Sequence, residues 1–97
     1  MKRLVIKARA KLDVRAIAEF IARDNPERAE SFVDELLARM SDAAQNPKIY
    51  RERLEWGPGI RSVLHHRYHI VFRETGDEVT ILRVLHGAQR FPEMFEE

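Results

Sequence analysis

The tripeptide Asp24-Asn25-Pro26 divides a helical pattern into two parts, and this break constrains the fold more than any other feature. A residue before proline disfavours the α conformation, whereas proline suits the first turn of a new helix, which Asn25 can cap. Before the break, with Asp13 as predicted N-cap, apolar residues follow helical spacing at Val14, Ile17, Ala18 and Ile21. After it, a longer stripe that ends at Asn46-Pro47 comprises Ala29, Phe32, Val33, Leu36, Leu37, Met40, Ala43 and Ala44. The short joint predicts an antiparallel helical hairpin.

Four further segments have the composition of β-strands. Residues 3–8 precede the hairpin, and residues 60–65, 68–74 and 78–86 follow it, with Thr75-Gly76-Asp77 as a turn. In the last strand, alternation sets Thr80, Leu82, Val84 and His86 against Val79, Ile81, Arg83 and Leu85. Both sets contain apolar residues, so both faces of the sheet should be covered. A short C-terminal helix with Phe91, Met94 and Phe95 on one face is expected to cover the second.

This order of elements predicts an α+β fold in one domain spanning residues 1–97. An N-terminal strand and an antiparallel helical hairpin would pack on a mostly antiparallel three- to four-stranded sheet, followed by a short C-terminal helix or tail. Trp56, the single tryptophan, is expected in the core.

Composition excludes several classes of function. The chain has no cysteine, which rules out disulfides, thiolate metal sites and cysteine nucleophiles. Its 17 basic and 16 acidic residues lack the basic excess of a general nucleic-acid binder. Without a signal-peptide pattern or an apolar run of membrane-spanning length, a cytoplasmic protein without membrane association is predicted.

The histidines near the middle of the strand region raise the question of a metal. His65 and His66 are adjacent, and neighbouring residues on a strand face opposite sides, so they would not share an ion unless a turn lies between them. No carboxylate joins them or His69 at a recognisable spacing. We therefore expect hydrogen-bonded histidines beside a turn, with no metal and no cofactor.

Basic residues are arranged unevenly along the chain. Between residues 51 and 90 all seven Lys or Arg positions are arginine, and all four histidines fall in the same stretch. Guanidinium groups suit carboxylates and phosphates, although they also form ordinary surface ion pairs. If the chain cleaved RNA, the cations and the titrating group would come from Arg61, Arg83, His86 and Arg90. The alternative is that His86 simply ends its strand before Gly87.

Four features together resemble the ParE branch of the RelE/ParE toxin superfamily. They are the helical pair broken at residues 24–26 and the segments PGIR, RYHIVF and ILRVLHG, which cover nearly the whole chain in order. The resemblance implies the toxin of a type II toxin–antitoxin pair, of the kind that maintains plasmids or chromosomal segments. It also implies a cognate antitoxin, expected to be ParD-like with a ribbon-helix-helix domain, in a heteromeric complex. ParE-like members inhibit DNA gyrase, whereas RelE-like members cut messenger RNA on the ribosome.

The residues favour the ParE branch. RelE-like nucleases usually have a catalytic tyrosine near the C-terminus, where this chain has Phe91 and Phe95 and a tail rich in glutamate. The leading expectation is therefore a gyrase inhibitor without catalytic residues that contacts its target through Arg83, His86, Arg90 and Phe91. The expected antitoxin contacts are Phe20, Trp56, Arg61 and Arg73. The alternatives are a ribosome-dependent endonuclease using the four basic residues named above, and a non-toxic homologue that only binds antitoxin.

Overall fold

The structure is a computed structural model that describes residues 2–87. The order of elements is β1 (Arg3–Ile6), α1 (Ala8–Ala22), α2 (Pro26–Gln45), 3₁₀ turns at Pro47–Ile49 and Leu54–Trp56, β2 (Ile60–His65), β3 (Tyr68–Thr75) and β4 (Glu78–His86). The predicted α+β order is confirmed, while the predicted C-terminal helix lies outside the described residues. No helix within residues 2–87 combines the length and the apolar character needed to cross a membrane.

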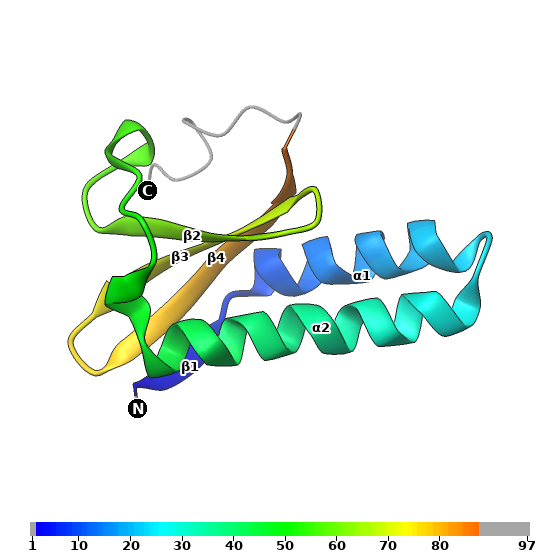
Figure 1. Cartoon of the computed structure of the whole chain (residues 1–97), viewed down its shortest axis with the longest axis horizontal. Coiled ribbons are helices and arrows are strands. Elements are labelled where there is room, and N and C mark those ends of the chain that lie inside the picture. The colour runs from blue at the N-terminus through cyan, green and yellow to red at the C-terminus, as the bar shows by residue number, and fades with distance from the viewer. Residues whose placement is uncertain (1, 88–97) are drawn as a thin grey trace.

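The four strands form one mixed sheet in the order β1-β4-β3-β2. β1 pairs in parallel with β4, whereas β4, β3 and β2 pair antiparallel, which confirms a mostly antiparallel sheet. The antiparallel helices pack against the sheet, and their connecting turn projects past it (Figure 1). The parallel pair is possible because the whole helical hairpin connects β1 to the other three strands.

The first helix begins earlier than predicted. α1 starts at Ala8, its N-cap Lys7 makes no side-chain cap, and Asp13 lies inside the helix. The prediction that Asp13 caps this helix is therefore wrong, and β1 ends at Ile6 and not at residue 8. The reason is that Ala10, which is fully buried, extends the apolar stripe by one turn towards the N-terminus.

The second helix begins as predicted. The Asn25 side chain accepts a hydrogen bond of 3.0 Å from the backbone N–H of Arg28, and Pro26 is the first helical residue. Asn46 ends the helix after Gln45. The local signals at both ends were sufficient here because capping and proline geometry act over only a few residues.

Hydrophobic residues pack on both faces of the sheet. The helices and one face bury the larger cluster, whose members include Ile17, Phe32, Leu36, Met40, Val63, Ile70, Phe72, Val79, Ile81 and Val84. On the other face, Trp56 packs with Ile60, Val71, Leu82 and Leu85. Trp56 is 8% exposed, which confirms its predicted core position. The second face is thus partly covered by the segment that precedes β2.

A β-bulge interrupts the alternation of β4. The pairing with β3 passes from Phe72↔Ile81 directly to Val71↔Arg83, which leaves Leu82 as the extra residue. Ile81 and Val84 consequently belong to the helix-side cluster, whereas Leu85 belongs to the opposite one. The strict alternation predicted from the sequence is wrong beyond Leu82, because one inserted residue exchanges the two faces of the strand.

Candidate functional site

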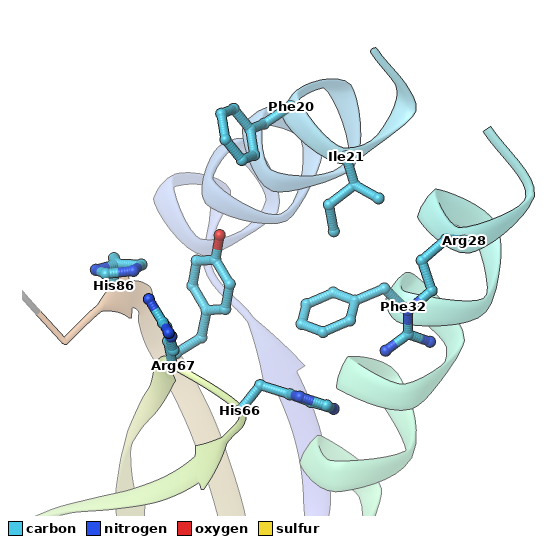
Figure 2. A pocket seen from close by; sticks show the side chains of 8 residues that line it. Phe20, Ile21, Arg28, Phe32, His66, Arg67 and His86 are labelled. Carbon is cyan, nitrogen blue, oxygen red and sulfur yellow. The ribbon is translucent and has the colours of Figure 1, made fainter. Parts of the chain in front are cut away.

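A cavity of about 680 Å³ lies where the helical hairpin meets the β2–β3 turn and the end of β4. Figure 2 shows Phe20, Ile21 and Phe32 projecting from the two helices, Arg28 also on α2, and the basic side chains of His66, Arg67 and His86 on the strand side. The lining residues are Phe20, Ile21, Arg28, Phe32, His66, Arg67, Tyr68 and His86. None of these eight described residues has a carboxylate, so the cavity suits an apolar ligand that also has negative charge.

Strand pairing and the helix break position the aromatic wall. Tyr68, the first residue of β3, pairs with His86, the last residue of β4, and their rings meet edge to face at 5.4 Å. Phe32 of α2 contacts Tyr68 at 5.7 Å between ring centroids. Phe20 lies in the last turn of α1 and is 63% exposed. An exposed aromatic ring beside a buried one is typical of a surface that binds a partner.

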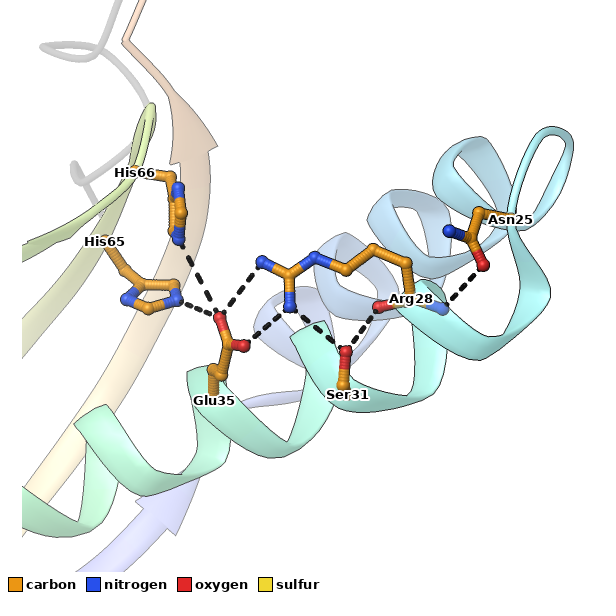
Figure 3. Close-up of polar contacts among 6 residues, drawn as sticks. All are labelled: Asn25, Arg28, Ser31, Glu35, His65 and His66. Carbon is orange, nitrogen blue, oxygen red and sulfur yellow. Dashed lines mark hydrogen bonds and ion pairs between the residues drawn. The ribbon is translucent and has the colours of Figure 1, made fainter.

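A polar network adjoins the cavity along α2. Arg28 donates two hydrogen bonds to the Glu35 carboxylate, at 2.6 Å to Oε2 and 3.3 Å to Oε1 (Figure 3). His65 Nε2 lies 2.8 Å from Oε1 of Glu35, and His66 Nε2 lies 3.8 Å from the same oxygen. The hydrogen bond from Arg28, followed by that from His65, lowers the pKa of Glu35 to about 2. Glu35 therefore stays ionised at neutral pH and holds the β2–β3 turn beside α2.

Arg83 is bound inside the protein. Its Nε and Nη2 atoms donate to the two carboxylate oxygens of Asp13 at 2.8 and 3.0 Å, and the Val84 backbone N–H donates to Oδ2 at 2.9 Å. The side chains of Arg83 and Asp13 are only 12% and 15% exposed. The hydrogen bond with Asp13 raises the pKa of Arg83. Arg83 thus joins β4 to α1, and its guanidinium binds Asp13 inside the protein, whereas a contact with the target was predicted from the sequence.

The predicted site residues are only partly brought together. Phe20 and His86 line the same cavity. Arg61 donates a hydrogen bond of 2.7 Å to the Tyr50 carbonyl oxygen. Trp56 is buried, so little of its side chain is accessible to a partner. Arg90 and Phe91 lie outside the described residues.

Arg61 and Arg73 belong to opposite faces of the sheet. Arg61 pairs with Phe72 of the helix-side cluster, whereas Arg73 pairs with Ile60 of the other cluster. Paired residues share a face, so the two arginines do not form one surface. The predicted antitoxin contacts are therefore divided between two sides of the molecule.

Sequence reasoning missed several residues at the cavity. Arg28, Arg67 and Tyr68 line it, yet none was assigned a role. Arg67 and Tyr68 belong to the RYHIVF segment, and the pairing of Tyr68 with His86 follows once the β3–β4 hairpin is closed. No comparable local signal in the sequence relates Arg28 to the cavity, because Arg28 lies at the cavity only as a result of how α2 packs.

His69 is expected to make stability depend on pH. Burial against Trp56, whose ring lies 5.7 Å away, lowers the pKa of His69, and the charge of Arg53 lowers it further. The folded state therefore binds fewer protons than the unfolded state just below pH 6.5, the ordinary histidine pKa. The free energy of unfolding should fall as the pH drops from 7.5 to 5. Measured by urea unfolding, the free energy of unfolding of His69→Gln should fall less steeply over this pH range than that of the wild type. Equal slopes for the variant and the wild type would contradict the lowered pKa of His69.

A family model for the ParE toxin of the type II toxin–antitoxin system parDE matches residues 4–91. This chain belongs to the ParE toxin family. A solved structure from the chromosomal ParDE toxin–antitoxin system of P. aeruginosa is similar to it, with a TM-score of 0.76 and 26% identity over 89% of this chain and 96% of that chain. No curated protein matches the sequence. The resemblance predicted from the sequence is confirmed.

The family match gives the cavity its biological setting. Residues 4–91 include every residue that lines the cavity and the Asp13–Arg83 pair. As a ParE-family toxin of a type II system, the protein has an antitoxin as its partner in a complex. The cavity is consequently a candidate for binding either that antitoxin or the target of the toxin.

Proposed function

We propose that this ParE-family protein inhibits DNA gyrase and that a ParD-like antitoxin with a ribbon-helix-helix domain neutralises it in the cytoplasm. The family match over residues 4–91 carries the proposal, because inhibition of gyrase is what resemblance to ParE implies. One observation from the structure and one from the sequence favour an inhibitor over a nuclease.

The first reason is that the basic residues expected of a nuclease are engaged. Stabilising the charge of a phosphorane needs cations aimed at the substrate. Asp13 neutralises Arg83, and Arg61 donates to a backbone carbonyl. The second reason lies in the sequence: Phe91 and Phe95 occupy the region where RelE-like nucleases usually have a tyrosine.

The proposed target contacts are at and beyond the end of β4. His86 lies at the cavity rim, and the chain continues towards Arg90 and Phe91. We assign Arg83 a positioning role, because its bidentate bond to Asp13 holds this end of β4 against α1. Aromatic and arginine residues are enriched at the energetic centres of protein interfaces, which fits binding to another protein.

The antitoxin is proposed to bind in the cavity and to contact Phe20 there. Its apolar wall would take apolar side chains of an antitoxin segment, and the Arg67 guanidinium group, which lines the same cavity, would meet acidic ones. Disordered antitoxin segments that fold on binding gain their affinity from burying such apolar surface. Arg61 and Arg73 would be secondary contacts on separate faces.

One arrangement favours the RelE-like alternative. Tyr68 and His86 place a phenol and an imidazole side by side in a basic cavity, and such groups can exchange protons with a ribose hydroxyl. If the chain cuts RNA, Tyr68 and His86 would carry the chemistry, with Arg67 as the cation. This constellation differs from the set of residues expected from the sequence, and only His86 is common to both.

A gyrase supercoiling assay with the purified full chain tests the proposal. Inhibition and gyrase-dependent DNA breaks are expected, and His86→Ala should raise the half-inhibitory concentration about tenfold, as for a contact worth about 1.4 kcal/mol. Arg73→Ala, on the opposite face, is the control and should inhibit like the wild type. Full gyrase activity at excess toxin would overturn the proposal.

The alternatives have their own outcomes. Messenger RNA cleavage in a translating extract, abolished by Tyr68→Phe, would establish the nuclease. Normal growth of a host that expresses the chain alone would identify a non-toxic homologue. Co-expression of the antitoxin encoded by the neighbouring reading frame should restore growth. If the antitoxin binds the cavity, Phe20→Asp should weaken that rescue.

A further inference from the structure

We propose that Glu35, His65 and His66 form a binding site for Zn²⁺ between α2 and the β2–β3 turn, a role that does not depend on the target of the toxin. One ligand atom from each residue lies within 4.8 Å of the other two. The Glu35 Oε1 atom lies 2.8 Å from His65 Nε2 and 3.8 Å from His66 Nε2 (Figure 3). Zinc bonds of 2.0–2.1 Å in tetrahedral geometry place neighbouring ligand atoms about 3.3 Å apart. The two distances bracket this value, so small side-chain movements would admit the ion.

The backbone brings the two histidines to the same side. His66 has a φ of 55° and is the only residue other than glycine with a positive φ among residues 2–87. Had the strand continued, His65 and His66 would face opposite sides of the sheet. The left-handed conformation instead places their ring centroids 4.6 Å apart. Such strained conformations are found preferentially at functional sites.

Neighbouring side chains orient the three ligands. Phe32 packs against the His65 ring at 5.3 Å and the His66 ring at 5.5 Å between centroids. The shorter bond from Arg28 holds Oε2 of Glu35, which leaves Oε1 directed at the histidines. Outer contacts of this kind fix the direction of the ligands in metal sites.

The chemistry and exposure of the cluster favour an accessible zinc site. Two imidazoles and one carboxylate are the protein ligands of many catalytic zinc ions, with a fourth position left for water or another ligand. The His66 side chain is 58% exposed, whereas His65 is largely buried, so an ion could enter from solvent and retain an open position. The Arg28 charge repels a dication, and we therefore expect weaker binding than at a closed structural zinc site.

Bound zinc would tie α2 to the β2–β3 turn at the edge of the cavity. Glu35 comes from α2, whereas the histidines end β2 and begin the turn, so one ion would join elements that are 30 residues apart in the sequence. A metal that binds only the folded state stabilises it. Zinc should therefore raise the melting temperature of the full chain, and a chelator should reverse the effect.

Titration calorimetry and Co²⁺ spectroscopy on the tag-free full chain test the proposal. We expect one equivalent of Zn²⁺ to bind, and Co²⁺ to give the visible absorption bands of a tetrahedral site. His65→Gln, His66→Gln and Glu35→Gln should each weaken Zn²⁺ binding at least about tenfold, as loss of one ligand contact worth more than 1.4 kcal/mol would. His69→Gln lies outside the cluster and is the control that should bind zinc like the wild type.

His66→Gln is the decisive variant, since its side chain is the most exposed of the three ligands and the folded protein should tolerate the change. Loss of the zinc-dependent rise in melting temperature in His66→Gln, with an unchanged melting temperature without metal, would support the site. Wild-type protein that binds no Zn²⁺, or a His66→Gln variant with wild-type affinity, would overturn it.

Discussion

Asp13→Ala is expected to lower the free energy of unfolding by about 2–4 kcal/mol. The substitution leaves the Arg83 guanidinium and the Val84 N–H without their carboxylate acceptor, at a place where both side chains of the ion pair are largely buried. Removing one partner of a buried pair costs about 3–5 kcal/mol, and the remaining exposure of this pair reduces that figure. Urea unfolding followed by circular dichroism measures the change.

An exposed ion pair on the same helix provides the matched control. Arg15 and Glu19 lie one turn apart with most of both side chains in water, so Arg15→Ala should change the free energy of unfolding by about 0.5 kcal/mol or less. The double variant Asp13→Leu/Arg83→Met should recover part of the stability, because apolar residues can replace a buried ion pair but cannot accept the Val84 N–H. Equal unfolding midpoints for Asp13→Ala and Arg15→Ala would contradict the role assigned to Asp13.

Phe72→Ala is expected to have the largest effect, a loss of about 3–5 kcal/mol. Phe72 is fully buried in the helix-side cluster, contacts Tyr50 edge to face at 6.0 Å between centroids, and pairs with Ile81 beside the bulge. Removing the ring leaves a cavity that the close-packed sheet and helices cannot fill. Since small domains are stable by about 5–15 kcal/mol in total, the variant should be close to unfolding.

Leu64→Ala is the control for Phe72→Ala. Leu64 lies on β2 and is 63% exposed, so a substitution there should change stability by about 0.5 kcal/mol or less. Thermal unfolding of both variants measures the contrast. A Phe72→Ala protein as stable as Leu64→Ala would mean that this core position is not as tightly packed as the structure indicates.

Local signals predicted most of the elements. The sequence patterns agree with the structure at the boundary between the helices, at the Asn25 cap and at the limits of β2 and β4. Each of these features depends on neighbouring residues. The start of α1 was misplaced because Asp13 resembles an N-cap, and its true partner lies 70 residues away on β4. An aspartate that caps a helix and an aspartate that binds a distant arginine look the same in the sequence.

The candidate site was predicted less completely. Phe20 and His86 were assigned roles, and both line the cavity. Arg28, Arg67 and Tyr68 were not. No metal was expected at His65 and His66 because no carboxylate has a recognisable spacing to them in the sequence, and the structure places Glu35 beside them. Each missing contact joins α2 to the sheet, and a single sequence contains no signal for such long-range packing.

Residue type and short-range spacing determined by themselves that this chain forms a helical hairpin and a sheet, that it lacks cysteine chemistry and that it resembles ParE. Tertiary structure alone decided three other features: the bulge at Leu82, the buried ion pair between Arg83 and Asp13, and the proximity of Glu35 to two histidines. The physical reason is that hydrogen bonds along a helix or turn connect neighbours, whereas strand register and ion pairs depend on how distant elements pack.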